Sequence, residues 1–255
     1  MKRSTLASVL SCLAGLAAAG STSAQVLHDN GPFVTHPAAH VSGADVSLAQ
    51  DQAYPGYTAL GYRVDADARL VDDFTVPEGK IWTVTGVRVF AYQAGSDAPF
   101  TDGRVRIWRG RPNFGGTIVY DGSATNTLVS STPGAYRIAQ SVNPTPPFTD
   151  TARHVQDILL SIPPQEFLRG IYWVDWTLVG PTAGAQVFTP PVSIIGQPYT
   201  SMVGFSGQYR VAAANWVTPL SNSTAYLVDL PFVLSGTSFD DRIFRGGFET
   251  FVPTP

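Results

Sequence analysis

Four aspartates with the chemistry of a cation site fall close together in the chain: Asp65, Asp67, Asp72 and Asp73. Hard cations such as Ca²⁺ take several oxygen ligands, and extracellular protein modules use such sites. The spacing of these aspartates is not that of an EF-hand loop. Aspartates are also frequent in turns as solvated carboxylates, which is the simpler interpretation. The sequence therefore offers calcium as a candidate cofactor, with a purely structural role in turns as the alternative.

A second group of residues could bind a sugar. Arg104, Arg106 and Trp108 alternate along one predicted strand, so their side chains share one face. An aromatic ring offers flat apolar area to a sugar ring, and the arginines beside it supply hydrogen-bond donors. The alternative is that Trp108 packs beneath the loop at 110–116, with the arginine stems laid over it. These three residues are the predicted ligand-binding site, and a polysaccharide or surface glycan is the predicted partner.

The sequence contains no recognisable motif for a nucleophilic hydrolase or a zinc site. The chain contains four histidines, and neither G-x-S-x-G nor H-E-x-x-H occurs. His154 and Asp157 are three residues apart in a predicted strand, which places them on opposite faces. His36 and His40 have the i,i+4 spacing of a helical metal site, but Pro37 argues against a helix there. No catalytic residue is predicted.

The sequence contains carboxylates that could act in glycoside hydrolysis, but no motif identifies two that work together. A glycosidase needs two of them on either side of the scissile bond. Aspartates are common along this chain, yet no spacing joins two of them across a cleft. A carbohydrate-active enzyme with an unrecognised carboxylate pair is therefore kept as the alternative function.

The segment 69–93 organises the predicted fold. Two β-rich runs, at 69–76 and 80–93, flank Pro77-Glu78-Gly79, which predicts a hairpin. Gly86 inside the second run predicts a bulge. Asp72 and Asp73 must point to opposite faces of the first strand. Only one of them can face the core, where a carboxylate needs partners.

The remaining chain repeats this pattern of short strands and turns. The run at 169–179 is apolar on both faces, which predicts a central strand covered on both sides. A short helix is predicted at 47–53, within an irregular segment at 25–62 that wraps the domain and supplies edge strands. Further strands are predicted at 103–109, 117–120, 127–131, 135–142, 153–162 (closed by Pro163-Pro164) and 225–234.

These elements predict an all-β fold. We expect a single antiparallel β-sandwich, jelly-roll-like in connectivity, over residues 25–236, followed by a linker and C-terminal tail at 237–255. No motif recurs at a fixed period, which argues against a propeller or solenoid.

The N-terminus predicts export. Lys2 and Arg3 precede an apolar run at 6–19, so residues 1–24 are interpreted as a signal peptide. Cys12 is the only cysteine, and lipidation there is a minor alternative. Its removal would leave an exported domain without disulfides. No later run is long and apolar enough for a membrane span. We expect a secreted, extracellular or periplasmic protein.

The charge pattern argues against polyanionic partners. The chain has a net charge of −3, and Lys80 is the only lysine beyond the leader. No basic block with interleaved aromatics occurs, so neither nucleic acid nor an anionic membrane surface is a predicted partner.

Several phrases of the chain resemble, as a set, a group of uncharacterised exported bacterial proteins: DNGPFVTHP (29–37), DDFTVP (72–77), GIYWVDW (170–176) and LPFVLSG (230–236). The ending DRIFRGGFE (241–249) resembles short C-terminal tails on secreted proteins of gammaproteobacteria. The resemblance implies an exported β-rich domain without an established activity, and it brings no functional residues.

Together these observations predict a secreted, non-catalytic β-sandwich that acts as a surface or extracellular binding or structural module, with a glycan as the candidate ligand. A purely structural domain that assembles through its sheet edges is a third hypothesis, and the oligomeric state is left open.

Overall fold

The structure is a computed structural model that describes residues 24–50, 60–197, 207–212, 214–218, 220–221 and 226–241. Almost all regular structure in these ranges is β-strand, as predicted, and the described residues contain no α-helix. No helix among them is long and apolar enough to cross a membrane. The predicted signal peptide and the IFRGGFE tail fall outside the described residues.

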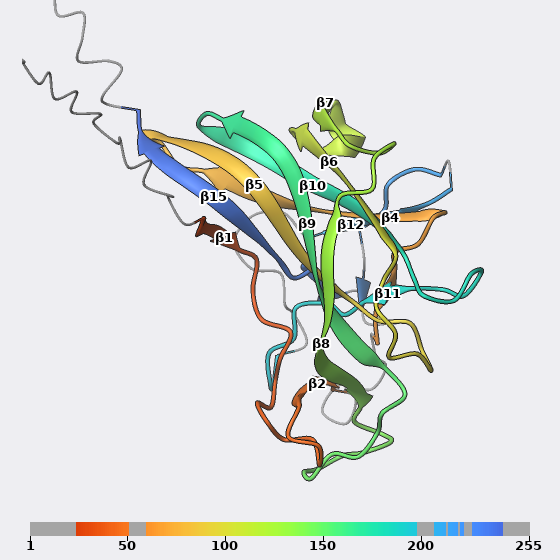
Figure 1. Cartoon of the computed structure of the whole chain (residues 1–255). Helices are drawn as coiled ribbons and strands as arrows, with labels where there is room; N and C mark the ends of the chain where they lie inside the picture. Colours follow the sequence, from red (N-terminus) through yellow and green to blue (C-terminus); the bar gives the residue numbers. More distant parts are fainter. Residues whose placement is uncertain are drawn as a thin grey trace, which may run out of the picture.

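Two large sheets form the domain (Figure 1). The six-stranded sheet has the order β1 (Gln25–Asp29), β15 (Phe232–Asp240), β5 (Lys80–Ala91), β9 (His154–Phe167), β8 (Leu128–Ala139), β2 (Asp45–Ala49). The five-stranded sheet has the order β12 (Gln208–Val211), β4 (Ala68–Val76), β10 (Gly170–Val179), β6 (Asp102–Arg109), β7 (Thr117–Asp121). All pairings are antiparallel except that of β2 with β8, which is parallel.

Shorter elements complete the described chain. β3 (Tyr62–Arg63) pairs with β11 (Phe188–Thr189), and β13 (Leu220–Ser221) pairs with β14 (Tyr226–Leu227). A single 3-10 turn, η1 (Pro112–Phe114), follows β6. β1 and β2 lie at the two edges of the six-stranded sheet, so the N-terminal segment does supply edge strands.

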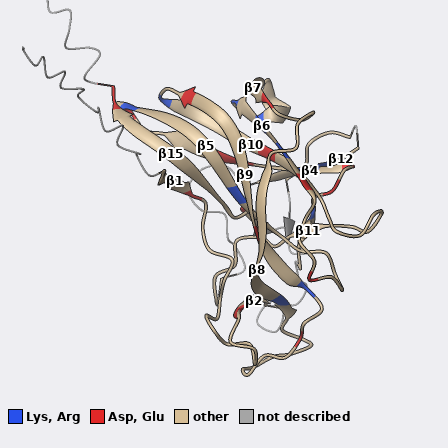
Figure 2. Ribbon diagram, viewed as in Figure 1, with Lys and Arg blue, Asp and Glu red and all other residues tan. Residues whose placement is uncertain are grey.

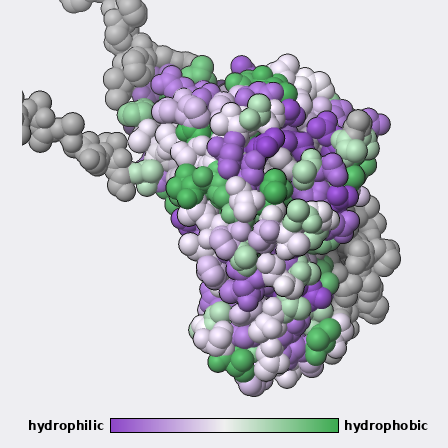
Figure 3. Space-filling model, turned by 45° about the vertical axis from the view of Figure 1, so that its right-hand side comes forward, coloured by the Kyte–Doolittle hydropathy of each residue, from purple (hydrophilic) through white to green (hydrophobic). Residues whose placement is uncertain are grey.

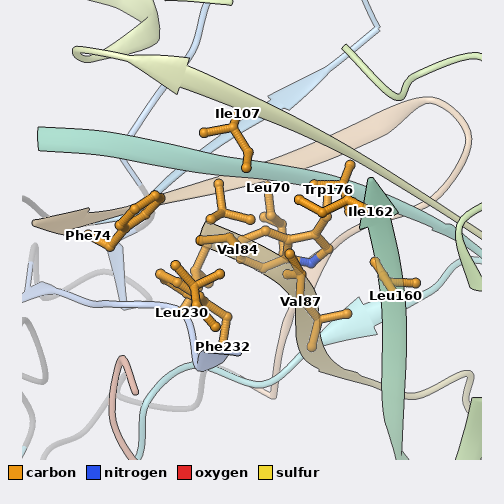
Figure 4. Packing of buried hydrophobic residues seen from close by; sticks show 14 of the residues in the cluster. Leu70, Phe74, Val84, Val87, Ile107, Leu160, Ile162, Trp176, Leu230 and Phe232 are labelled. Atoms are coloured by element: carbon orange, nitrogen blue, oxygen red, sulfur yellow. The ribbon is translucent and has the colours of Figure 1, made fainter. Parts of the chain in front are cut away.

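The main core lies between the two sheets (Figure 4). Leu70 and Phe74 of β4 and Trp176 of β10 meet Val84 and Val87 of β5 in this cluster, and all are buried. Burial of such side chains contributes about 1.5–3 kcal/mol each. The alternation along each strand explains the placement, because every second residue points inward. The predicted central position of the strand at 169–179 is confirmed, since β10 lies between β4 and β6.

The predicted hairpin at 69–93 is wrong. β4 pairs with β10 and β12, whereas β5 pairs with β15 and β9. The turn at 77–79 therefore carries the chain from one sheet to the other. Both strands have an apolar face, so the pattern fits a hairpin and a sheet-to-sheet connection equally well. The predicted irregularity at Gly86 is confirmed by a shift of register in both ladders of β5.

Gly79 gives this turn a testable weakness. Its φ is 73°, and a Cβ at this position would meet no atom within 4 Å. Gly79→Ala is therefore expected to cost about 1–2 kcal/mol of unfolding free energy through backbone strain alone. Gly79→Asn should cost less, since asparagine tolerates the left-handed region. Urea denaturation measures both, and equal losses would contradict a cost set by φ.

The predicted helix at 47–53 is also wrong where the structure describes it, because residues 45–49 form strand β2. Val46 and Leu48 pack together with Tyr136, Ile138 and Phe148 in a second apolar cluster, and this period of two is a strand's. Residues 51–53 lie outside the described residues.

Three predicted strand boundaries shift. β9 continues through Pro163 and Pro164 to Phe167, because its register with β5 jumps from Ser161 to Gln165 and the prolines fall in that gap. The strands predicted at 127–131 and 135–142 are one strand, β8. β15 continues beyond residue 236 to Asp240, paired with β5 throughout, so the start of the predicted linker belongs to the sheet.

Candidate ligand-binding site

A pocket opens on the outer face of the five-stranded sheet. It has a volume of about 460 Å³, and its charged lining consists of Arg69, Arg104, Arg106, Arg210, Asp67 and Asp102. We call it the arginine pocket. Figure 2 shows charges of both signs on the strands of this sheet. Figure 3 shows hydrophilic residues gathered over the upper part of the molecule, on the side where β4, β6 and β12 lie.

The strand registers bring these arginines together. Arg69 of β4 lies directly opposite Arg210 of β12, and Arg104 of β6 lies opposite Thr177 of β10, which also lines the pocket. Arg106 lies between Asp175 of β10 and Asp121 of β7. Side chains two residues apart on a strand share a face, so neighbouring strands present this row of cations side by side.

Two of the arginines are held by carboxylates at the pocket rim. Arg104 Nη2 lies 2.8 Å from Asp102 Oδ2, and Arg106 Nε lies 2.9 Å from Asp121 Oδ1. Hydrogen bonds from Ser123 and the Arg106 guanidinium lower the pKa of Asp121 to about 2. These ion pairs restrain the long side chains, so the donors that face the pocket are positioned before a ligand arrives.

The third arginine, Arg69, is held by a buried carboxylate of the neighbouring strand. Arg69 Nε donates to Asp175 Oδ1 at 2.6 Å, and Trp108 Nε1 donates to Asp175 Oδ2 at 3.0 Å. Asp175 is fully buried, and burial raises the pKa of its carboxyl against the opposing effect of Arg69. One carboxylate therefore fixes both the pocket arginine and the indole beside it.

Trp108, predicted as a sugar-stacking residue, is half-buried and is not part of the pocket lining. It packs against an aromatic cluster on the same face of the sheet, formed with Val71, Trp173 and Trp216. The guanidinium of Arg111, at the start of the 110–116 loop, lies 5.8 Å from the Trp173 ring. Of the three predicted ligand-binding residues, the structure thus brings Arg104 and Arg106 into one pocket and places Trp108 in the cluster next to it.

Arg69 and Arg210 were not predicted as site residues. The alternation along the strand at 69–76 indicates that the side chains of Arg69 and Asp73 share one face, and this was the only indication for Arg69 in the sequence. Nothing in the sequence indicates that Arg210, far along the chain, pairs with this strand.

The four aspartates predicted as calcium ligands do not converge. Asp65 accepts a hydrogen bond from Arg63 Nε at 2.5 Å, and Asp67 lies 3.6 Å from the same guanidinium. Asp72 points into the space between the sheets, and Asp73 lies on the other side of β4. Within the described ranges, no group of three or more His, Cys, Asp or Glu side chains is arranged to hold a metal ion. The geometry gives the calcium prediction no support.

Asp72 instead accepts hydrogen bonds that connect parts of the fold. Its Oδ2 accepts hydrogen bonds from Asn30 Nδ2 at 2.9 Å and from the Leu230 amide at 2.7 Å. Its Oδ1 accepts one from the Asp73 amide at 2.9 Å. Burial and the nearby charge of Asp229 raise the pKa of Asp72 well above its ordinary value. As expected for a core-facing carboxylate, it has partners, and it ties the N-terminal segment to the chain at residue 230.

Carboxylates suited to glycoside hydrolysis are not evident in the described residues. Asp72 and Asp229 are near one another but buried, at 0% and 2% exposure, where no substrate reaches them. Asp67 and Asp102 line the arginine pocket, but Asp67 is largely exposed and Asp102 is bonded to Arg104. Neither has the apolar surroundings in which glycosidases keep a carboxylic acid protonated.

No protein-family model, curated protein or solved structure matches this chain. The resemblance to exported bacterial proteins stays a prediction.

Proposed function

We propose that this protein is an exported, non-catalytic binding module that binds a glycan in the arginine pocket. The observation that carries the proposal is the pocket itself: four arginines from three strands line about 460 Å³ of open space on one sheet face. Ligand sites commonly span about 300–1,000 Å³, so one or two sugar rings are a suitable occupant.

The ion pairs in the lining support binding over a merely solvated surface. An outward sheet face in a sandwich is commonly polar, but its long side chains usually move freely. Here Arg69, Arg104 and Arg106 are each held by a carboxylate within 3 Å. Ordering these side chains in advance reduces the entropy that ligand binding would otherwise cost.

The chemistry of the lining favours a sugar. Guanidinium groups donate and carboxylates accept, so Arg104 and Asp102 together can satisfy both roles of a hydroxyl group. The net negative charge of the chain argues against a polyanion such as nucleic acid.

Arg106→Gln tests the site. The ion pair of Arg106 with Asp121 is partly exposed, so we expect the unfolding free energy to change by about 1 kcal/mol or less. The affinity for a bound oligosaccharide should fall about tenfold, because a charge-assisted hydrogen bond is lost. A glycan array of the exported protein identifies the oligosaccharide, and isothermal titration calorimetry measures its dissociation constant.

Arg88→Gln is the matched control. Arg88 belongs to β5 of the other sheet and pairs with Asp157 at 3.3 Å, so the same charge is removed from a comparable ion pair. Its affinity for the oligosaccharide should be unchanged. Equal losses in both variants would place the binding elsewhere, and hydrolysis of the bound oligosaccharide would overturn the non-catalytic assignment.

A further inference from the structure

The arginines of the arginine pocket differ in their ion pairs. Arg69, Arg104 and Arg106 each have a carboxylate within 3 Å, namely Asp175, Asp102 and Asp121. Arg210 has no carboxylate partner among the residues that the structure describes, and its guanidinium lies over the Trp216 ring at 4.8 Å. Arg210 lies at the β4–β12 side of the pocket.

Arg210 also faces a charge of its own sign. Its direct cross-strand partner is Arg69, and like charges in this position destabilise a sheet pair. Asp175 neutralises Arg69 through Nε only. Two guanidinium groups therefore lie in neighbouring positions, and Asp175 pairs with only one of them.

Two donors at this point have no acceptor within the described part of the chain. Arg69 Nη2 and Arg210 Nε are both buried and make no hydrogen bond there. Buried donors without partners are rare in native proteins, because an unmade hydrogen bond leaves the desolvation of the donor uncompensated. Both belong to side chains that line the arginine pocket.

We propose that Arg69 and Arg210 form a subsite for the carboxylate of an acidic sugar. This inference rests on the proposed glycan-binding function and names its ligand class. One carboxylate has two oxygens, so it can accept hydrogen bonds from both guanidinium groups, and its negative charge suits two arginines that share the single carboxylate of Asp175. It would also screen the repulsion between the two arginines.

The remaining lining argues for a monoanion over a dianion. Asp67 and Asp102 line the same pocket, so a phosphate group with two charges would be repelled by them. Ser123 also lines the pocket, and its hydroxyl oxygen can accept a hydrogen bond from a ring hydroxyl of a uronic acid.

Calorimetry with the full chain and monosaccharides tests the subsite. Glucuronate is expected to bind at least tenfold more tightly than glucose, and its affinity should fall as salt is raised. Arg210→Gln should weaken glucuronate binding about ten- to hundredfold and glucose binding much less, so the preference for glucuronate is lost. Arg88→Gln, with the same change of charge, should retain the preference for glucuronate.

The outcomes separate this inference from the proposed function. Binding of neutral oligosaccharides with no preference for glucuronate would overturn the subsite and leave glycan binding intact. Glucuronate binding that depends on Arg210, without binding of any longer glycan, would support the anion subsite and overturn the broader function. Loss of glucuronate binding in Arg88→Gln to the same extent would show a nonspecific charge effect and overturn the subsite, as would tighter binding of inorganic phosphate than of glucuronate.

Discussion

Replacing Asp175 with leucine is expected to lower the unfolding free energy by about 3–5 kcal/mol. Asp175 is fully buried, and it holds the Arg69 guanidinium at 2.6 Å and the Trp108 indole at 3.0 Å. Its removal would leave a charged group with 12% side-chain exposure without its counter-ion and an indole donor without its acceptor. Chemical denaturation followed by tryptophan fluorescence measures the loss.

A double variant separates this pairing effect from simple damage to the sheet. Arg69→Met together with Asp175→Leu removes both charges and fills a similar volume, and such replacements are often neutral or stabilising. The double variant should therefore recover most of the stability lost by Asp175→Leu alone. Failure to recover would mean that Asp175 acts through contacts other than Arg69. The double variant should also lose the preference for glucuronate, because it lacks half of the proposed subsite.

The sequence predicted the class of fold because alternation is a local property. The central place of the strand at 169–179 follows from its two apolar faces, and the structure confirms it. The hairpin at 69–93 failed for the same reason. Alternation states which face of a strand is buried, but it does not state which of two sheets the strand joins.

The candidate site was predictable only in part. Arg104 and Arg106 stood out because they alternate on one strand. Arg210 lies near them only because β12 pairs with β4, and no sequence pattern predicts that these two strands pair or in which register. The aspartates at 65–73 misled as a calcium site, because closeness in sequence did not place them on one face. Asp72 and Asp73 illustrate this, since adjacent residues of a strand point in opposite directions.

Asp72 provides the second prediction with a large expected effect. Asp72→Ala would remove the acceptor for three donors, the Asn30 side-chain amide and the backbone amides of Asp73 and Leu230. Each buried donor left without a partner costs about 1–3 kcal/mol, so the total loss is expected to exceed about 3 kcal/mol. Because one of these bonds holds Asn30, limited proteolysis should also detect release of the N-terminal segment.

Asp72→Asn is expected to show an altered dependence of stability on pH. Burial and the charge of Asp229 raise the pKa of Asp72 in the folded state, so folding favours its protonated form. The stability from this proton is fully present below the unfolded pKa of about 3.9 and is lost as pH rises through the folded pKa. Asparagine does not titrate, so the stability difference between the natural protein and the variant should shrink with rising pH, by at most about 1.4 kcal/mol per pH unit.

Asp121→Asn is the control of opposite sign. The pKa of Asp121 is lowered to about 2, so its contribution is present above the unfolded pKa and is lost as pH falls toward 2. The difference between the natural protein and this variant should therefore grow between pH 2 and pH 4 and stay level above it. Urea denaturation at a series of pH values measures all three proteins. A stability difference for Asp72→Asn that stays constant from pH 4 upward would mean that the buried carboxyl next to Asp229 carries no extra proton in the folded state.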